Sequence, residues 1–353
     1  MNQKTVIGIT QGDTNGVGYE VIIKSLLDNR ITELFTPVIY GSSKFVAYYK
    51  KLIAGAESFS VHVINSASEA HHKRINLVQC VPESCTVESG KRSPDGAKAA
   101  LAALQAAVQD MKSSKIHALV TAPFNKQTVH EGGFAFPGHT EFLANAFNVS
   151  HYIMLLCSDV MRVGVATGHI PISSVASKLK RELIVQKIKQ LHESMQLDFQ
   201  VEKPKIAVMG LNPHAGDGGV LGNEEIDVII PAITEVTQQG ILAFGPYAAD
   251  GFFGTASFQH FDAILSMYHD QGLVPFKTIS FHNGYNFTAG LPIIRTSPDH
   301  GTAYGIAGQD KASPESMMAA IYAANDLHKS RIQYKELRKN RLKPIVLEGA
   351  QIG

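Results

Sequence analysis

Short runs of apolar and β-branched residues alternate along this chain with longer segments in which apolar residues recur at helical spacing. The short runs predict strands, and the longer segments predict helices between them. This alternation is typical of an α/β fold with a largely parallel sheet. The predicted strands, several with the loop that follows, are 6–10, 37–41, 117–125, 152–158, 162–169, 205–216 and 261–272, and the predicted helices are 21–27, 93–114, 224–240 and 313–330.

The clearest helix is 93–114, an Ala- and Leu-rich body that follows Ser93 as N-cap and Pro94 in the first turn. Ser313 is the expected cap of the last helix. The stretch 295–316 is so rich in Gly, Ala, Ser and Thr that we expect no strand there. A loop of that length in a compact domain is usually functional, and its composition favours a binding loop close to a ligand.

Composition narrows the class of protein. With 353 residues the chain is long enough for about two domains, and 44% hydrophobic against 18% charged residues allow a large core. A formal net charge of +1 argues against the basic footprint that nucleic-acid binding needs. No apolar run reaches the length of about 18 residues that a membrane span requires. We therefore expect neither a nucleic acid nor a membrane as partner.

The cysteines and the two ends of the chain give limited information on cellular setting and partners. Cys80, Cys85 and Cys157 form no CxxC pair and no even disulfide set, which indicates a reducing, cytoplasmic setting. The N-terminus lacks the pattern of a signal peptide. The basic residues between Lys329 and Lys343 alternate with apolar ones, so we interpret them as a solvated helical face.

Three histidines each follow the C-terminal end of an apolar run: His169 after VGVATG, His214 after IAVMGLNP and His269 after AILSMY. In open α/β sheets the ligand crevice lies at the carboxyl ends of the strands. Three imidazoles brought there could hold one divalent metal and leave a position open for substrate. A chain with 15 histidines also places some at strand ends by chance. The Gly and Pro turn residues beside all three favour the metal interpretation.

A second group of residues suits an anionic ligand. It comprises His139 and Thr140 in FPGHTEF, with Lys277, Asn286 and Arg295 downstream. Arg offers a planar fork and Lys a point charge, the pairing expected for a phosphate or a carboxylate. Any single member, taken alone, is better explained as ordinary surface charge, so the interpretation depends on the group.

Two Gly-containing stretches, GDTNGVGYE and MYHDQGLVPFK, are interpreted as turns. GDTNGVGYE follows the first strand, but its G-x-x-x-G-x-G spacing is neither the GxGxxG dinucleotide fingerprint nor a P-loop. It remains a turn that permits close backbone approach. In MYHDQGLVPFK we expect Gly272 and Pro275 to turn the chain so that Lys277 faces the anionic ligand.

Eight motifs, in this order, make the chain resemble the 4-hydroxythreonine-4-phosphate dehydrogenase family: GDTNGVGYE, FPGHTEF, TGHIPI, GLNPHAGDGGVLGNEE, GPYAAD, MYHDQGLVPFK, GYNFTAGLPIIRTSPDHGTAYGIAG and ASPES. Together they span nearly the whole chain. The resemblance implies a two-domain α/β/α fold of the isocitrate/isopropylmalate dehydrogenase type, which binds a nicotinamide dinucleotide without a GxGxxG loop. We expect one domain of 1–130 plus 300–353 with the cofactor loop, and a second of 131–299 with the metal, substrate and dimer contacts.

The resemblance also implies a role for each candidate residue. The ligands of a divalent metal, zinc first and cobalt, manganese or magnesium as alternatives, would be His169, His214 and His269. Contacts to a phosphorylated substrate would come from His139, Thr140, Lys277, Asn286 and Arg295. The adenosine end of NAD or NADP would lie against His300, Gly301, Thr302 and Ala303. The enzyme would be a homodimer whose metal site is shared between subunits.

The sequence departs from the family pattern at two places. Thr14 and Tyr19 replace prolines of the N-terminal motif. Gly305 stands where related loops commonly carry Asp. A carboxylate there would bond the 2′-hydroxyl of the adenine ribose and repel a 2′-phosphate, so its absence weakens any preference for NAD over NADP.

The implied reaction is the NAD(P)- and metal-dependent oxidation of 4-phosphooxy-L-threonine to 2-amino-3-oxo-4-phosphooxybutanoate. This product decarboxylates to 3-amino-2-oxopropyl phosphate, a precursor of pyridoxal phosphate. The catalytic candidates are Asp270, Asp250 and Lys277, where either aspartate could accept the proton and Asp270 could instead orient a histidine. The alternative is a related 4-phosphothreonate or 4-phosphoerythronate dehydrogenase of sugar-acid catabolism. A metal-dependent phosphoester hydrolase would be excluded by dinucleotide-dependent turnover.

Overall fold

The computed structural model describes residues 4–340, and the strands within that range form one twelve-stranded sheet. The α/β class predicted from the alternation of strands and helices is therefore confirmed. In sheet order the strands are β3 (His62–Ile64), β4 (Asn76–Gln79), β2 (Phe35–Gly41), β1 (Thr5–Thr10), β5 (Ala118–Thr121), β12 (Ile294–Pro298), β11 (Tyr285–Ala289), β6 (Ile153–Cys157), β7 (Arg162–Val165), β10 (Ala263–Ser266), β8 (Lys205–Met209) and β9 (Leu242–Tyr247).

The sheet is largely parallel, as predicted. Antiparallel pairing occurs where the two halves of the sheet meet, since β11 runs antiparallel to β12 and β6, and β6 runs antiparallel to β7. The strands from β3 to β12 on one side, and from β7 to β9 on the other, pair in parallel. The junction strands β12, β11 and β6 thus join two parallel sheets into one.

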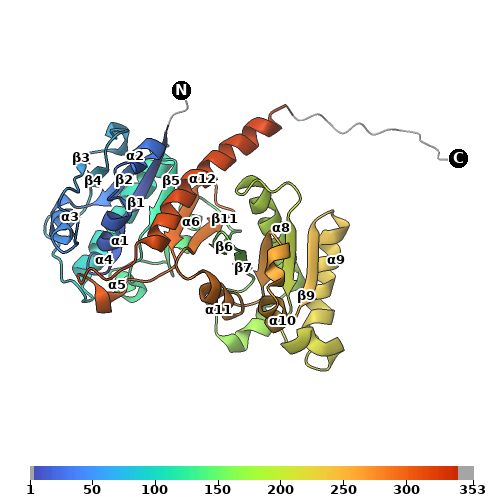
Figure 1. Ribbon diagram of the computed structural model, residues 1–353. Coiled ribbons are helices and arrows are strands. Elements are labelled where there is room, and N and C mark those ends of the chain that lie inside the picture. The colour runs from blue at the N-terminus through green and yellow to red at the C-terminus, as the bar shows by residue number, and fades with distance from the viewer. Residues whose placement is uncertain (1–3, 341–353) are drawn as a thin grey trace.

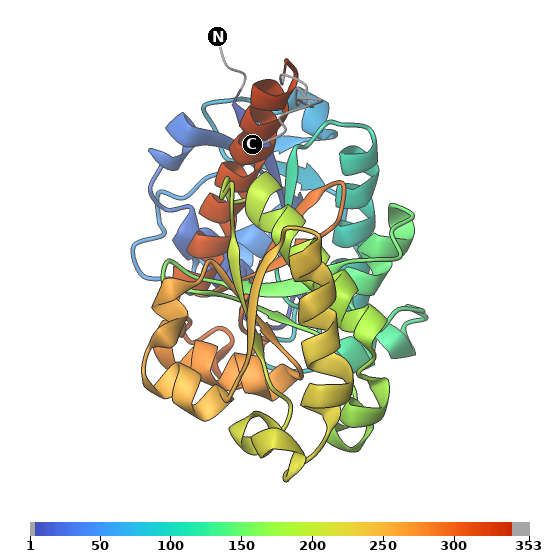
Figure 2. The same cartoon turned by 90° about the vertical axis from the view of Figure 1, so that its right-hand side faces the viewer.

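Helices cover the sheet in both halves (Figure 1). The side view in Figure 2 shows α9 on the outer side of the second half. The long helix α12 packs across β1, β5, β12 and β11 and also contacts α8. The helices are α1 (Gly18–Ser25), α2 (Ile31–Leu34), α3 (Ser43–Lys50), α4 (Pro94–Lys112), α5 (Lys126–Glu131), α6 (His139–Ala146), α7 (Val175–Lys178), α8 (Arg181–Leu197), α9 (Ile230–Gln238), α10 (Ala249–Gly254), α11 (His269–Ser280) and α12 (Glu315–Arg338).

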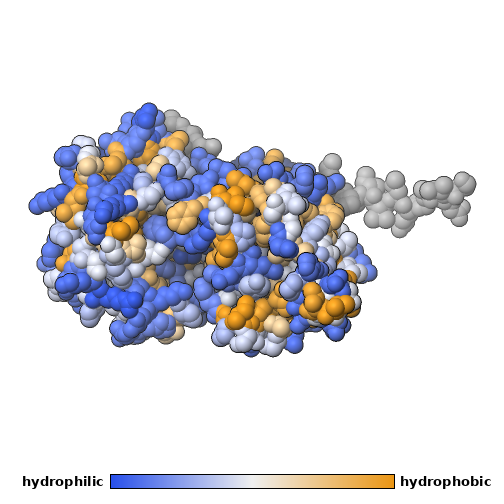
Figure 3. All heavy atoms as spheres, turned by 60° about the horizontal axis from the view of Figure 1, so that its bottom comes forward, coloured by the Kyte–Doolittle hydropathy of each residue, from blue (hydrophilic) through white to orange (hydrophobic). Residues whose placement is uncertain are grey.

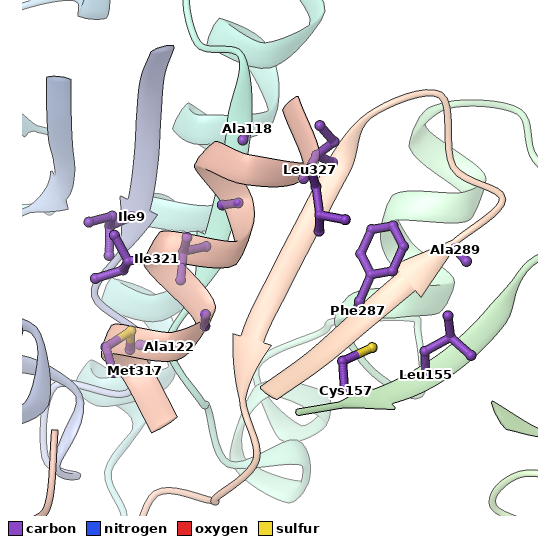
Figure 4. Close-up of a cluster of buried hydrophobic side chains, with 14 of the residues drawn as sticks. Ile9, Ala118, Ala122, Leu155, Cys157, Phe287, Ala289, Met317, Ile321 and Leu327 are labelled. Carbon is purple, nitrogen blue, oxygen red and sulfur yellow. The ribbon is translucent and has the colours of Figure 1, made fainter. Parts of the chain in front are cut away.

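One apolar core runs through both halves. Ile9 of β1, Ile321 of α12 and Phe287 of β11 belong to the same buried cluster, part of which is shown in Figure 4. Smaller clusters lie within each half. Since one sheet and one core connect the halves, the domain boundaries proposed from the sequence (1–130 plus 300–353, and 131–299) stay a prediction.

Helix α4 confirms the cap that the sequence predicted, because Ser93 Oγ accepts the N–H of Gly96 at 3.1 Å. At α12 the helix begins at Glu315 with Pro314 at the N-cap position, so Ser313 is not the N-cap. The hydroxyl of Ser313 nevertheless accepts the N–H of Glu315 at 3.3 Å.

Two expectations for local structure are wrong. Residues Gly272 and Pro275 lie inside helix α11 rather than in a turn. Gly272 serves packing instead, since a Cβ there would lie 2.7 Å from Val163 of β7, so the helix can approach the sheet closely. The start of 295–316 is also not a loop, because Arg295 belongs to the central strand β12.

The surface of the face shown in Figure 3 mixes polar side chains with apolar patches. Within residues 4–340 no helix combines the length and the apolar character that crossing a membrane requires.

Candidate active site

A cavity of about 990 Å³ lies where the two halves of the sheet meet. It is lined by residues of the central strands β5, β6, β11 and β12 and by residues of α6, α8 and α11. The predicted site residues that line it are His139, Thr140, His169, His269, Asp270, Lys277, Asn286, Arg295, His300 and Gly301. The predicted site residues outside it are His214, Asp250, Thr302 and Ala303.

Arg295 is the buried cation of this cavity, with 7% of its surface exposed. Its Nε and Nη2 atoms donate to Thr121 Oγ1 at 3.0 and 2.7 Å, and Nη1 donates to Thr288 Oγ1 at 3.3 Å. No ion pair formed within residues 4–340 includes it. Burial lowers the pKa of Arg295 to about 10, and the negative charge of Glu141 opposes this only in part. A buried guanidinium that forms no ion pair is well suited to bind an anion.

His139 and Thr140 begin helix α6 and line the cavity near Arg295. The imidazole of His139 stacks on the ring of Phe124, with centroids 3.8 Å apart. Burial, and then the positive charges of Arg295 and Lys126, lower the pKa of His139 well below its usual value. His139 is therefore a neutral imidazole that can donate one hydrogen bond to an anion.

Lys277 and Asn286 meet at Asp299, a carboxylate that the sequence reasoning missed. Lys277 Nζ lies 3.3 Å from Asp299 Oδ1 and donates to the Asp299 carbonyl at 3.2 Å. Burial raises the pKa of Asp299, whereas the charge of Lys277 and hydrogen bonds from Lys277 and Asn286 oppose the rise. Ser316 Oγ accepts the Asp299 N–H at 2.8 Å. The only sequence signal was the carboxylate in SPDHG, directly before the predicted cofactor loop.

His169 and His269 lie side by side, with ring centroids 5.3 Å apart. His269 Nδ1 is 2.7 Å from Asp270 Oδ1, which leaves Nε2 for a ligand. Burial, followed by the charges of Lys126 and His269, lowers the pKa of His169 and favours the neutral form that binds metals. Asp270 thus lies where a residue that orients a metal ligand would be expected.

His214 is exposed in the turn η3 (Pro213–Gly219) and lies outside the cavity that His169 and His269 line. The strands β7, β10 and β8 are parallel neighbours, but the backbone after β8 is left-handed from His214 to Gly218, with φ between 44° and 85°. Each non-Gly residue in this conformation costs about 1–2 kcal/mol. No three His, Cys, Asp or Glu residues within 4–340 are placed to hold a metal together. His169 and His269 supply two imidazoles, one fewer than the three protein ligands typical of a catalytic zinc site.

The N-terminal Gly-rich turn and the loop after β12 lie against each other. The Val17 N–H donates to the Thr302 carbonyl at 3.0 Å, and a Cβ on Gly16 would lie 2.6 Å from that oxygen. The Tyr304 hydroxyl donates to Asp13 Oδ2 at 2.7 Å. The close backbone approach that the glycines allow therefore holds two loops of the chain together, with the predicted cofactor loop at the contact.

The family model described as "Pyridoxal phosphate biosynthetic protein PdxA" matches residues 33–324. The chain belongs to this family. It is 48% identical over 341 residues to a 4-hydroxythreonine-4-phosphate dehydrogenase from Bacteroides thetaiotaomicron, covering 96% of this chain and 93% of the relative. The prediction of an enzyme of this family is confirmed.

Two further PdxA relatives are informative. A crystal structure of 4-hydroxythreonine-4-phosphate dehydrogenase from Klebsiella pneumoniae has a TM-score of 0.82 at 32% identity, and the match covers 93% of this chain and all of the other. A relative from Oceanobacillus iheyensis, 38% identical over 93% of this chain and 99% of its own length, is provisionally named a D-threonate 4-phosphate dehydrogenase. Similar chains thus carry names with two different substrates.

This PdxA chain also has a cation in the cavity that the sequence did not reveal. Lys187 on α8 lines the cavity and donates to the Tyr152 carbonyl. Burial lowers the pKa of Lys187 to about 8. A lysine within an amphipathic helix carries no sequence signal that would separate it from a surface residue.

Proposed function

We propose that this PdxA enzyme oxidises the C3 hydroxyl of 4-phosphooxy-L-threonine with NAD(P)+ as hydride acceptor, and that the β-keto acid product then loses CO2. The observation that carries the proposal is Arg295, a buried guanidinium without a carboxylate partner among the described residues. A buried charge is stable only when it is paired, so the cavity is built to receive an anion. A substrate with both a phosphate and a carboxylate meets that requirement.

The cations of the cavity can share the two anionic groups of the substrate. Arg295 offers a planar fork for one of them, with neutral His139 as an additional donor. Lys277, held by Asp299, offers a point charge for the other. Asn286 would orient the substrate between them, since its side chain lines the same cavity.

We further infer that a divalent metal, zinc by ligand type, binds His169 and His269 of one subunit and His214 of the partner subunit. His214 is exposed in the left-handed turn, and the apolar side chains of Val220 and Ile226, which follow it along the chain, are exposed to 79% and 46%. A second copy of the chain would cover these apolar side chains, which supports a homodimer. When bound, the metal supplies a Lewis acid that lowers the pKa of the substrate hydroxyl and stabilises the developing charge.

The two aspartates and the cofactor loop then have different roles. Asp270 fixes the tautomer of His269 through the 2.7 Å contact with Nδ1, so we assign it the orienting role rather than that of the base. Asp250 is exposed on α10, outside the cavity of its own chain, and would reach a substrate only across a subunit interface. The cofactor would lie along His300 and Gly301, which line the cavity next to Asp299.

The test is an assay of metal-free protein reloaded with Zn²⁺, Co²⁺, Mn²⁺ or Mg²⁺, following the absorbance of the reduced dinucleotide. We expect turnover of 4-phosphooxy-L-threonine with production of CO2. Faster turnover of 4-phospho-D-threonate would instead assign the chain to the substrate named for the Oceanobacillus iheyensis relative. Turnover of neither substrate with either dinucleotide would contradict the proposal.

A further inference from the structure

Glu225 is a buried carboxylate that the proposed chemistry does not use. It is the first residue of a π-helical turn, η4 (Glu225–Ile229), and 2% of its surface is exposed. Its Oε1 atom accepts the N–H groups of Leu211 and Asn212 at 2.7 and 2.8 Å, and Oε2 accepts Nδ2 of Asn212 at 2.9 Å. All of these donors lie directly before His214, so the carboxylate fixes the start of the turn that carries the histidine.

The turn is also folded around the Glu225 carboxylate. Gly216 lies inside it with φ +85°, and a Cβ there would lie 2.7 Å from Glu225 Oε2. The base of the turn is tied to the strand that leads to His269, because Gln271 Nε2 donates to the Gly210 carbonyl at 2.6 Å and Gln271 Oε1 accepts the Met267 N–H at 2.7 Å. One network therefore sets the direction in which the chain leaves β8.

We propose that Glu225 is a positioning residue that holds the left-handed turn and so sets the direction of the His214 side chain. The inference rests on the proposed metal site shared between subunits. A run of left-handed residues persists only where its surroundings enforce it. The Glu225 carboxylate holds this run at two points, through the N–H groups of Leu211 and Asn212 before it and through its close contact with Gly216 inside it. Without these contacts the chain would relax toward right-handed conformations, and His214 would point elsewhere.

The first test replaces Glu225 by Gln, which keeps the shape. The change removes the charge that strengthens the hydrogen bonds from the Leu211 and Asn212 N–H groups, and it turns an amide NH2 toward the Asn212 side chain. The matched control is Glu224→Gln, because Glu224 accepts from the Asn212 side chain at 2.8 Å, whereas the N–H groups of Leu211 and Asn212 donate to Glu225. Metal-free, full-length protein is titrated with Co²⁺ and followed by absorbance. We expect Glu225→Gln to weaken Co²⁺ binding by about 10–100-fold, the usual effect of losing a residue that orients a metal ligand, and the control to change it less than threefold.

Hydrogen exchange of the same metal-free variants reports on the turn itself. In Glu225→Gln the amides of Leu211 and Asn212 should exchange at least tenfold faster, while amides of β8 keep their protection. The two measurements belong together, since a general loss of structure would raise exchange throughout the sheet. Wild-type Co²⁺ affinity in Glu225→Gln, or unchanged exchange at both amides, would overturn the inference.

A pair of glycine substitutions tests the contact between Gly216 and Glu225 without changing the charge of Glu225. Gly216→Ala introduces a methyl group against Glu225, whereas Gly218→Ala, also at positive φ, meets nothing within 4 Å. Both variants have the backbone strain, but only the first disturbs the carboxylate. We expect Gly216→Ala to weaken Co²⁺ binding at least fivefold more than Gly218→Ala, and equal effects would count against a role for Glu225.

The outcomes separate this inference from the proposed function. Wild-type protein that binds no Co²⁺, or that binds it equally well after His214→Ala, refutes the shared metal site. Wild-type protein that binds Co²⁺ through His214, together with a Glu225→Gln variant of the same affinity, refutes only the positioning role.

Discussion

Replacement of Arg295 by Met should raise or maintain the stability of the protein while it removes most of the activity. Burial lowers the pKa of Arg295 from 12.5 to about 10. At about 1.4 kcal/mol per pKa unit, this shift corresponds to roughly 3 kcal/mol of unfavourable free energy of the charged form. Loss of the hydrogen bonds to Thr121 and Thr288 offsets part of the gain, at about 1 kcal/mol each. The free energy of unfolding should therefore rise by about 0–2 kcal/mol.

The effect on catalysis has the opposite sign. Truncating one member of a buried, hydrogen-bonded charge pair costs about 2–5 kcal/mol. For Arg295→Met this predicts that kcat/KM for the phosphorylated substrate falls between about 30-fold and a few thousand-fold. Steady-state kinetics gives the change in kcat/KM, and urea unfolding of substrate-free protein gives the change in stability.

Arg331 provides a matched control. It is also buried, but its Nε donates to Asp198 at 2.6 Å and its Nη1 donates to the carbonyls of Leu291 and Ile293. Arg331→Met should therefore lose about 3–5 kcal/mol of stability, because it leaves a buried carboxylate unpaired. If Arg295→Met behaves like Arg331→Met, or if its kcat/KM is unchanged, Arg295 is a structural residue and the reasoning fails.

Three further predictions concern the cofactor, the substrate and pH. Gly305→Asp places a carboxylate where a Cβ meets nothing within 4 Å, and should raise the ratio of NAD to NADP in kcat/KM by at least tenfold; an unchanged ratio would place the adenine ribose elsewhere. Asp299→Asn removes the carboxylate that holds Lys277, and should raise KM by about tenfold with a smaller change in kcat, whereas wild-type KM would show that Lys277 needs no such partner. His328 stacks on His117 with centroids 4.8 Å apart, and burial lowers the pKa of His328 from 6.5 to about 4. The pKa of His328 is lower in the folded protein than in the unfolded chain, so the neutral imidazole contributes to the free energy of unfolding. This contribution is complete above pH 6.5 and is lost as the pH falls toward 4. Urea unfolding at pH 7 and pH 5 should show wild-type protein losing about 1–2 kcal/mol more than His328→Gln, and equal losses would exclude the stacked pair as the cause.

The sequence was sufficient for those parts of the fold that follow local rules. The β-branched runs predicted β1, β2, β6 and β7, because strands that are covered on both sides of a sheet need apolar residues on both faces. The central strands β11 and β12 were missed, since they carry the polar side chains of the cavity. Asn286 of β11 and Arg295 and Ser297 of β12 line this cavity, and the buried Thr288 of β11 accepts a hydrogen bond from Arg295. Residues that serve the site thus broke the pattern by which strands are recognised.

The candidate site was only partly predictable, because the position of each histidine depends on the turn that follows its strand. His169 and His269 follow strands whose carboxyl ends are neighbours in the sheet, so their meeting could be inferred from topology. His214 follows the next parallel strand, yet five left-handed residues turn it outward. Nothing in the spacing of the histidines reveals that turn, and only the glycines of PHAGDGG and the buried Glu225 indicate it. The proposed metal site therefore requires a second subunit, and the direction that this turn gives to His214 decides whether that subunit can supply the third ligand.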